Sequence, residues 1–226
     1  MCIRDSYTAC DDKISIKTLT KENVSSHYLI TTLRWDPIFQ LVSENERAWH
    51  AGFSSFHGRT NLNDTSIGIE IVNLGFSEID GELQFYSFEE SQIRKTAHLL
   101  KKISKKYSIE PTNILGHSDI APGRKSDPGP RFPWERLYKE FGIGAWYDTA
   151  DYNFYYDSAI FNIYSIEDIQ SEFKKYGYDM EISGEWSENE KNVLKAFQMH
   201  FRPENTSGEM DLETFAIIKA LNHKYR

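Results

Sequence analysis

The spacing of apolar residues changes along the chain, and this change constrains the fold more than any other feature. Between residues 28 and 117 the apolar runs are short, and the segment 66–72 (SIGIEIV) alternates as a half-buried strand does. After residue 165 the apolar residues recur only at helical intervals of three or four positions. We therefore expect an α/β domain with a mixed central sheet flanked by helices, followed by a small all-α domain of three helices.

The first domain is predicted to combine short strands with one long helix. Ser87 and Glu90 have the spacing of a capping box, and the helix that they open carries apolar residues at helical spacing as far as Tyr107. Four of the seven prolines lie within 122–133, which predicts a rigid loop. The strands are expected at 28–30, 38–42, 66–72 and 113–117. Together these elements place the end of the domain near residue 145.

The second domain is predicted to begin after a linker. Ser165, Ser187 and Asp211 each precede a run of apolar residues at helical spacing, and residues of these types favour helix N-termini. The preceding segment is turn-like and aromatic, and we interpret it as a linker packed on the surface. The predicted boundaries are 1–145 for the first domain, 146–164 for the linker and 165–226 for the second domain.

Charge and hydropathy argue against two classes of protein. Lys and Arg total 26 against 34 Asp and Glu, a net charge of -8, whereas nucleic-acid-binding proteins normally present a basic face. No run approaches the roughly 18 consecutive apolar residues that a membrane span needs. We therefore expect no nucleic-acid partner and no transmembrane segment. Cys2 and Cys10 are too few for a disulfide framework, and they leave the redox compartment open.

Four polar residues of the first domain have the types that a zinc hydrolase needs. Glu70 lies on the polar face of a strand, His117 ends a buried strand, and Lys125 and Asp127 follow in the proline-rich loop. Imidazole nitrogen and carboxylate oxygen are zinc ligands. A second carboxylate can take a proton from water, and a cation can stabilise an oxyanion. These residues are therefore candidates for a catalytic metal site.

Each candidate also has a structural explanation. Glu70 fits a solvated strand residue paired with a cation, and His117 fits a hydrogen-bonded core histidine. Asp127 precedes Pro-Gly and suits a turn, and Lys125 fits a surface charge beside Arg124. Spacing alone predicts no more than an α/β domain with a possible metal site.

Four strings in fixed order make the prediction more specific. They are VSSHYLI at 24–30, AWHAG at 48–52, NDTSIGIE at 63–70 and GHSDIAPGRKSDPGP at 116–130. Together they resemble the type-2 family of zinc-dependent N-acetylmuramoyl-L-alanine amidases, in its branch of outer-membrane lipoproteins. The resemblance runs from Tyr7 to the end of the chain, and it implies the mixed sheet and flanking helices of the type-2 amidase fold.

The resemblance implies a role for each candidate. His117 and Asp127 correspond to two ligands of one catalytic zinc ion, Glu70 to the carboxylate that activates water, and Lys125 to the lysine that stabilises the oxyanion. The implied reaction is hydrolysis of the amide between N-acetylmuramic acid and the L-alanine of the peptidoglycan stem peptide. His27 and His50 fall in family strings without being metal ligands, and His50 is the better candidate for substrate contact.

The chain departs from the family where its first zinc ligand is expected. The family has a histidine before Tyr-Thr-Ala at the end of its opening strand, whereas here Ser6 precedes Tyr7. Residues 1–6 show neither strand alternation nor an apolar signal segment. We therefore expect the opening strand to be missing from a truncated or spliced sequence whose gene continues upstream with the strand and an export signal. As written, the chain is expected to bind zinc poorly and to be weakly active or inactive.

The C-terminal strings point to the cell wall. GEWS at 184–187, KAFQ at 195–198 and GEMDLET at 208–214 resemble a three-helix peptidoglycan-binding module. The alternative is a packing domain that binds no ligand. The resemblance implies peptidoglycan or muropeptides as partners, and the periplasm or a periplasm-facing outer-membrane anchor as the location. Two other functions are weighed: a non-catalytic peptidoglycan-recognition protein on the same fold, and a zinc hydrolase of the same fold that acts on another amide.

Overall fold

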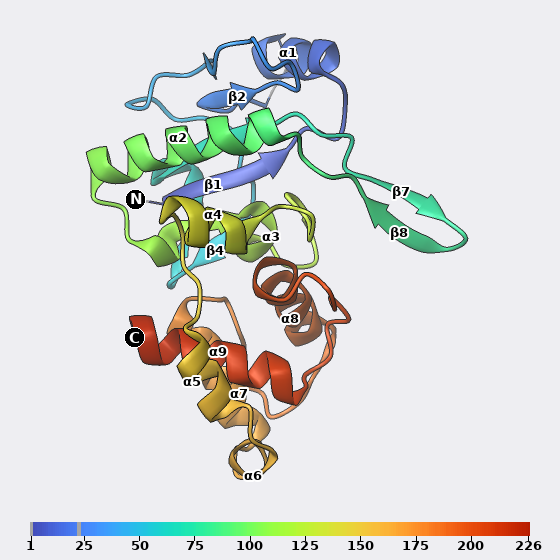
Figure 1. Cartoon of the computed structure of the whole chain (residues 1–226), viewed down its shortest axis with the longest axis vertical. Coiled ribbons are helices and arrows are strands. Elements are labelled where there is room, and N and C mark those ends of the chain that lie inside the picture. Colours follow the sequence, from blue (N-terminus) through green and yellow to red (C-terminus); the bar gives the residue numbers. More distant parts are fainter. Residues whose placement is uncertain (1, 22–23) are drawn as a thin grey trace.

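The computed structural model of the chain describes residues 2–21 and 24–226, so Met1 lies outside the described residues. The strands are β1 (Cys2–Tyr7), β2 (Tyr28–Ile30), β3 (Phe39–Gln40), β4 (Ser55–Phe56), β5 (Arg59–Thr60), β6 (Ser66–Ile71), β7 (Phe76–Ile79), β8 (Glu82–Phe85) and β9 (Ile114–Gly116). The α-helices are α1 (Asp12–Lys21), α2 (Glu90–Tyr107), α3 (His117–Ile120), α4 (Trp134–Phe141), α5 (Thr149–Tyr155), α6 (Ser158–Phe161), α7 (Ile166–Tyr176), α8 (Glu188–Phe201) and α9 (Leu212–Tyr225). This element order confirms the predicted α/β class with helices after the sheet (Figure 1).

A five-stranded mixed sheet in the order β3-β2-β6-β1-β9 forms the centre of the first domain. Strands β2, β6, β1 and β9 run parallel, and β3 is antiparallel to β2. The register pairs Ser6 with Glu70 and Asp5 with Gly116, the residue before His117. Because parallel strands end at one edge of the sheet, the register brings residues 6, 70 and 117 together there.

The opening strand is present, and the prediction that it is missing was wrong. Residues Cys2–Tyr7 form β1 between β6 and β9, so both sides of the strand pair with neighbours. Backbone pairing and the burial of Ile3 outweigh the poor apolar pattern of the segment. The strand does place a carboxyl group in the core: Asp5 is fully buried, and its two carboxyl oxygens accept no hydrogen bond from the described residues. This burial raises the pKa of Asp5 to about 8.

The other predicted strands and the long helix are confirmed, with a different helix start. Helix α2 begins at Glu90 and has Glu89 at its N-cap, two residues after the predicted cap at Ser87. Gln92 accepts a hydrogen bond from the Glu89 backbone N–H at 3.0 Å and donates one to the Val72 carbonyl at 2.6 Å. The second bond joins the helix start to the sheet, which local spacing does not reveal.

The hairpin β7–β8 projects from the body of the molecule beyond the predicted elements (Figure 1). Its side chains are largely exposed, among them Phe76, Ile79 and Leu83. The sequence pattern left this segment without a predicted element.

The C-terminal region has the three predicted helices α7, α8 and α9, but the predicted linker is itself partly helical. It contains α5 and α6, and α5 packs along α9 (Figure 1). Tyr152, Ile160 and Phe161 pack against the core, because the aromatic residues that suggested a surface linker supply an apolar face. Helix α8 lies against α3 and α4 of the first domain.

Candidate active site

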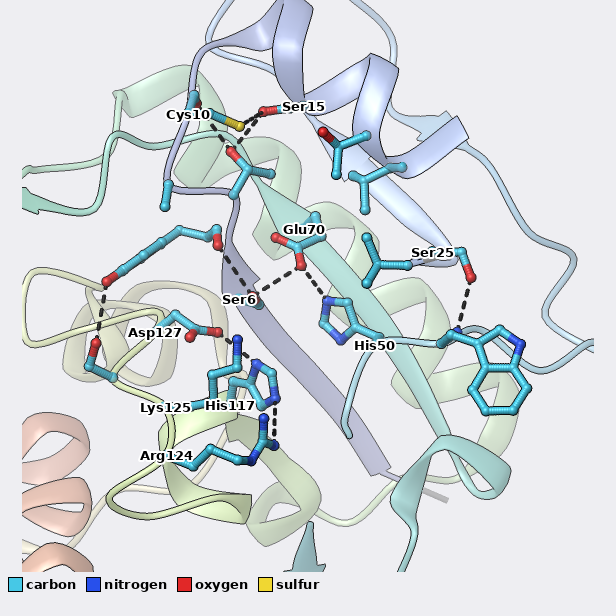
Figure 2. A pocket seen from close by; sticks show the side chains of 18 residues that line it. Ser6, Cys10, Ser15, Ser25, His50, Glu70, His117, Arg124, Lys125 and Asp127 are labelled. Atoms are coloured by element: carbon cyan, nitrogen blue, oxygen red, sulfur yellow. Dashed lines mark hydrogen bonds and ion pairs between the residues drawn. The ribbon is translucent and has the colours of Figure 1, made fainter. Parts of the chain in front are cut away.

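A cavity of about 370 Å³ opens at the carboxyl edge of the parallel strands. Its lining includes all four sequence-predicted candidates, together with Ser6 and His50. Figure 2 shows these side chains reaching the cavity from β1, β6, the 48–52 segment, α3 and the proline-rich loop. Lys125 lines this cavity while its side chain stays exposed to solvent.

His117 and Asp127 form a buried pair on one wall. His117 begins α3 directly after β9, and its Nδ1 lies 2.9 Å from Asp127 Oδ2, while its Nε2 lies 3.0 Å from the Ala51 carbonyl oxygen. The Ser118 backbone N–H donates to the Asp127 carbonyl at 2.8 Å, which holds the loop against the helix. Burial raises the pKa of Asp127, but the hydrogen bond and charge of His117 and the charge of Lys125 outweigh it, so this pKa is lowered.

Glu70 lies on the opposite side of the cavity, on β6. Its Oε1 accepts a hydrogen bond from Ser6 Oγ at 3.1 Å and lies 2.7 Å from His50 Nε2. The His50 ring stacks on His117 with centroids 5.7 Å apart and an interplanar angle of 14°. His50 therefore connects the carboxylate to the His117–Asp127 pair (Figure 2).

His27 lies in the core, and Arg124 reaches the cavity although it was not predicted as a site residue. His27 Nδ1 accepts a hydrogen bond from the Gly68 backbone N–H at 3.0 Å, which fits a structural role. Arg124 donates to the carbonyl oxygens of Ala51 and Phe53 at 2.5 and 2.7 Å, and burial lowers its pKa. The signal for Arg124 was its place beside Lys125 in the 116–130 string.

The side chains present do not complete a zinc site. Protein zinc sites use at least three side-chain ligands. Among residues 2–21 and 24–226, no group of three His, Cys, Asp or Glu side chains is arranged to hold a metal ion. His117 and Asp127 are two donors of the right type, but Ser6 offers a hydroxyl that is hydrogen-bonded to Glu70. The family resemblance predicts the third donor at position 6, where the chain has Ser6.

A carboxylate, a lysine and a His–Asp pair face one cavity at the sheet edge, and these are residue types that a hydrolase uses. Residues 3–130 match the family described as N-acetylmuramoyl-L-alanine amidase, and residues 164–218 match a putative peptidoglycan binding domain. The chain therefore belongs to the N-acetylmuramoyl-L-alanine amidase family, and it is an enzyme of this class by descent.

Relatives in sequence and in structure match nearly the whole chain. N-acetylmuramoyl-L-alanine amidase AmiD of Escherichia coli K12 is 46% identical over 97% of this chain and 81% of its own length. The crystal structure of AmpDh3 from Pseudomonas aeruginosa has a TM-score of 0.91 at 46% identity, covering 99% of this chain and 91% of that one. E. coli AmiD in complex with the substrate anhydro-N-acetylmuramic acid-L-Ala-D-gamma-Glu-L-Lys has a TM-score of 0.90 at 43% identity, covering 99% of this chain and 89% of that one.

AmiD favours the amidase over a non-catalytic recognition protein, because it is named as an amidase and is solved with its substrate. In the part of the chain that the structure describes, no helix is long and apolar enough to cross a membrane.

Proposed function

We propose that this site, when position 6 supplies a third zinc ligand, hydrolyses the amide between the lactyl group of N-acetylmuramic acid and the L-alanine of the stem peptide. The observation that carries the proposal is the meeting of Glu70, His117, Lys125 and Asp127 in one cavity. The relatives support the substrate class, because AmiD and AmpDh3 are solved with anhydromuramic peptides. Peptidoglycan and muropeptides are therefore the proposed partners.

We assign the proton transfers to Glu70. Its carboxylate faces the cavity and can take a proton from the attacking water and give it to the departing amine of L-alanine. The Lys125 ammonium lies beside the His117–Asp127 pair and lines the same cavity, so it can stabilise the negative charge on the amide oxygen (Figure 2). His50 is proposed to touch the substrate, because its ring lines the cavity between Glu70 and His117.

One zinc ion is the proposed cofactor of the complete site. His117 and Asp127 supply two donors, and the third belongs at position 6, where the chain has serine. A serine hydroxyl is neutral near pH 7 and is a poor zinc ligand. No catalytic step is therefore assigned to a metal in the chain with Ser6.

The decisive experiment compares the chain with its Ser6→His variant for zinc content and for release of stem peptide from muropeptides. We expect about one zinc per chain and stem-peptide release only for Ser6→His. Zinc binding and cleavage by both proteins would show that another residue supplies the third ligand. Peptidoglycan binding without cleavage by either protein would instead favour the recognition-protein alternative, and Ser6→Ala is the control for loss of the hydroxyl alone.

The C-terminal domain is proposed to bind peptidoglycan and bring the catalytic cavity to the wall. The division into 1–145, 146–164 and 165–226 remains our proposal, supported by the match of residues 164–218 to a putative peptidoglycan binding domain. Peptidoglycan lies in the periplasm of bacteria that have an outer membrane. We therefore propose that the protein acts there, either free or anchored to the outer membrane.

A further inference from the structure

A buried carboxylate joins the two domains directly behind the active site. Asp119 lies in α3, two residues after His117, and only 1% of its surface is exposed. Its Oδ2 accepts a hydrogen bond from the Gly116 backbone N–H at 2.7 Å, across the start of α3. A carboxylate buried in this way is costly unless hydrogen bonds surround it. Its other partners therefore matter for the position of α3.

Both of these other partners come from the C-terminal region. The Tyr178 hydroxyl donates to Asp119 Oδ1 at 2.6 Å, and His200 Nδ1 donates to Asp119 Oδ2 at 2.7 Å. Tyr178 follows α7 and His200 lies on α8, and both side chains are almost fully buried. Two elements of the C-terminal domain thus hold the residue that closes the first turn of α3.

The ring of His200 is itself held on both faces. It stacks on Trp134 of α4 and on Phe201, with ring centroids 4.0 Å apart in each case and interplanar angles of 15° and 10°. This packing between the first domain and α8 fixes the direction of the Nδ1–H bond. If α3 were displaced, His200 could not move with it, so the hydrogen bond to Asp119 would be lost.

Helix α8 also packs closely against the loop that carries Lys125. Gly123 has a φ of +74°, and a Cβ atom added there would lie 2.7 Å from Asn192 Nδ2 on α8. Lys125 and Asp127 lie two and four residues further along this loop. The C-terminal domain thus contacts both segments that supply the His117 wall of the cavity.

We propose that the C-terminal domain is a positioning part of the active site as well as a wall-binding module. Asp119, Tyr178 and His200 act as positioning residues: they hold the start of α3, and with it His117, in the working arrangement. This inference rests on the proposed function, because that function assigns His117 to the reaction centre. It predicts that the hydrogen bonds across the domain interface control turnover rather than substrate affinity.

The first test removes one hydroxyl from the full chain. Tyr178→Phe deletes the bond to Asp119. Tyr225→Phe is the matched control, because within residues 2–21 and 24–226 the Tyr225 hydroxyl bonds only to the Trp146 backbone. In the chain with Ser6, we expect faster amide hydrogen exchange at 116–121 in Tyr178→Phe and no change there in Tyr225→Phe. In the Ser6→His background, we expect kcat to fall about tenfold in Tyr178→Phe, with KM within about twofold.

The second test asks for rescue at His200. Asn places a side-chain N–H near the position of His Nδ1, whereas Leu fills similar space without a donor. In the Ser6→His background, His200→Asn is therefore expected to keep most of the kcat that His200→Leu loses. Equal kcat in these two variants, or equal effects of Tyr178→Phe and Tyr225→Phe, would overturn the inference and leave a merely structural interface. If Ser6→His binds no zinc and cleaves nothing, the proposed function fails, and the hydrogen-exchange comparison still decides the inference.

Discussion

At the scale of single residues, the two neighbouring positions Asp5 and Ser6 of β1 have opposite consequences. The side chain of Ser6 reaches the cavity and meets Glu70, so its chemistry decides whether a third ligand is present. The side chain of Asp5 is fully buried, and its raised pKa records the cost of placing a carboxylate there. One position bears on function and the other on stability.

Because Asp5 is buried, we expect the free energy of unfolding to fall as pH rises. The pKa of Asp5 is about 8 in the folded chain against an ordinary 3.8, so the folded state holds its proton longer than the unfolded state does. The stabilisation from this proton is complete below about pH 4 and is lost as pH rises toward 8, a loss of the order of 5 kcal/mol at roughly 1.4 kcal/mol per pH unit.

Replacing Asp5 by an apolar residue should remove this dependence. Asp5→Val is expected to raise the free energy of unfolding at pH 8 and to flatten its decline between pH 5 and 8, measured by urea denaturation at several pH values. Glu78→Val, at an exposed position of β7, is the control. A decline that persists unchanged in Asp5→Val would show that other groups cause it.

At the scale of elements, the sequence predicted what local spacing determines and missed what tertiary contacts determine. The alternation at 66–72 predicted β6, and the apolar residues after Ser165 predicted α7. Strand β1 was missed because pairing on both sides stabilises a segment with little apolar pattern. In the site, Glu70 and His117 could be named from the sequence, but the place of His50 beside Glu70 needed the fold.

The start of α2 gives a prediction at this scale. Gln92→Ala removes the acceptor for the Glu89 N–H, in a partly buried bond, and the donor to the Val72 carbonyl, in a buried one. We expect the free energy of unfolding to fall by roughly 2 kcal/mol. Chemical denaturation measures the change, with Gln84→Ala at an exposed position of β8 as the control. An equal loss in both variants would contradict the role given to the helix start.

At the scale of the whole molecule, net charge limits how the protein can reach its partner. The chain carries a net charge of -8, and peptidoglycan stem peptides carry carboxylates, so long-range attraction does not draw the two together. Affinity must therefore come from short-range contacts.

Salt tests this conclusion. Because added salt screens repulsion between like charges, we expect binding to purified sacculi to stay constant or to strengthen between about 0.05 and 0.5 M NaCl. Co-sedimentation measures the bound fraction, and a basic protein such as a polylysine-tagged variant serves as the opposite control. Binding that weakens steeply over this range would reveal a basic contact surface that net charge conceals.

The place of β1 in the sheet also bears on how the chain folds during synthesis. Strand β1 pairs with β9 through Ile3 and Ile114. Its second edge therefore stays uncovered until β9 has left the ribosome. A contact between such distant residues slows folding, and an open strand edge is a template for pairing with another nascent chain. The β1–β9 side of the sheet is therefore its last part to close, and the period before β9 emerges is when this protein is most exposed to aggregation.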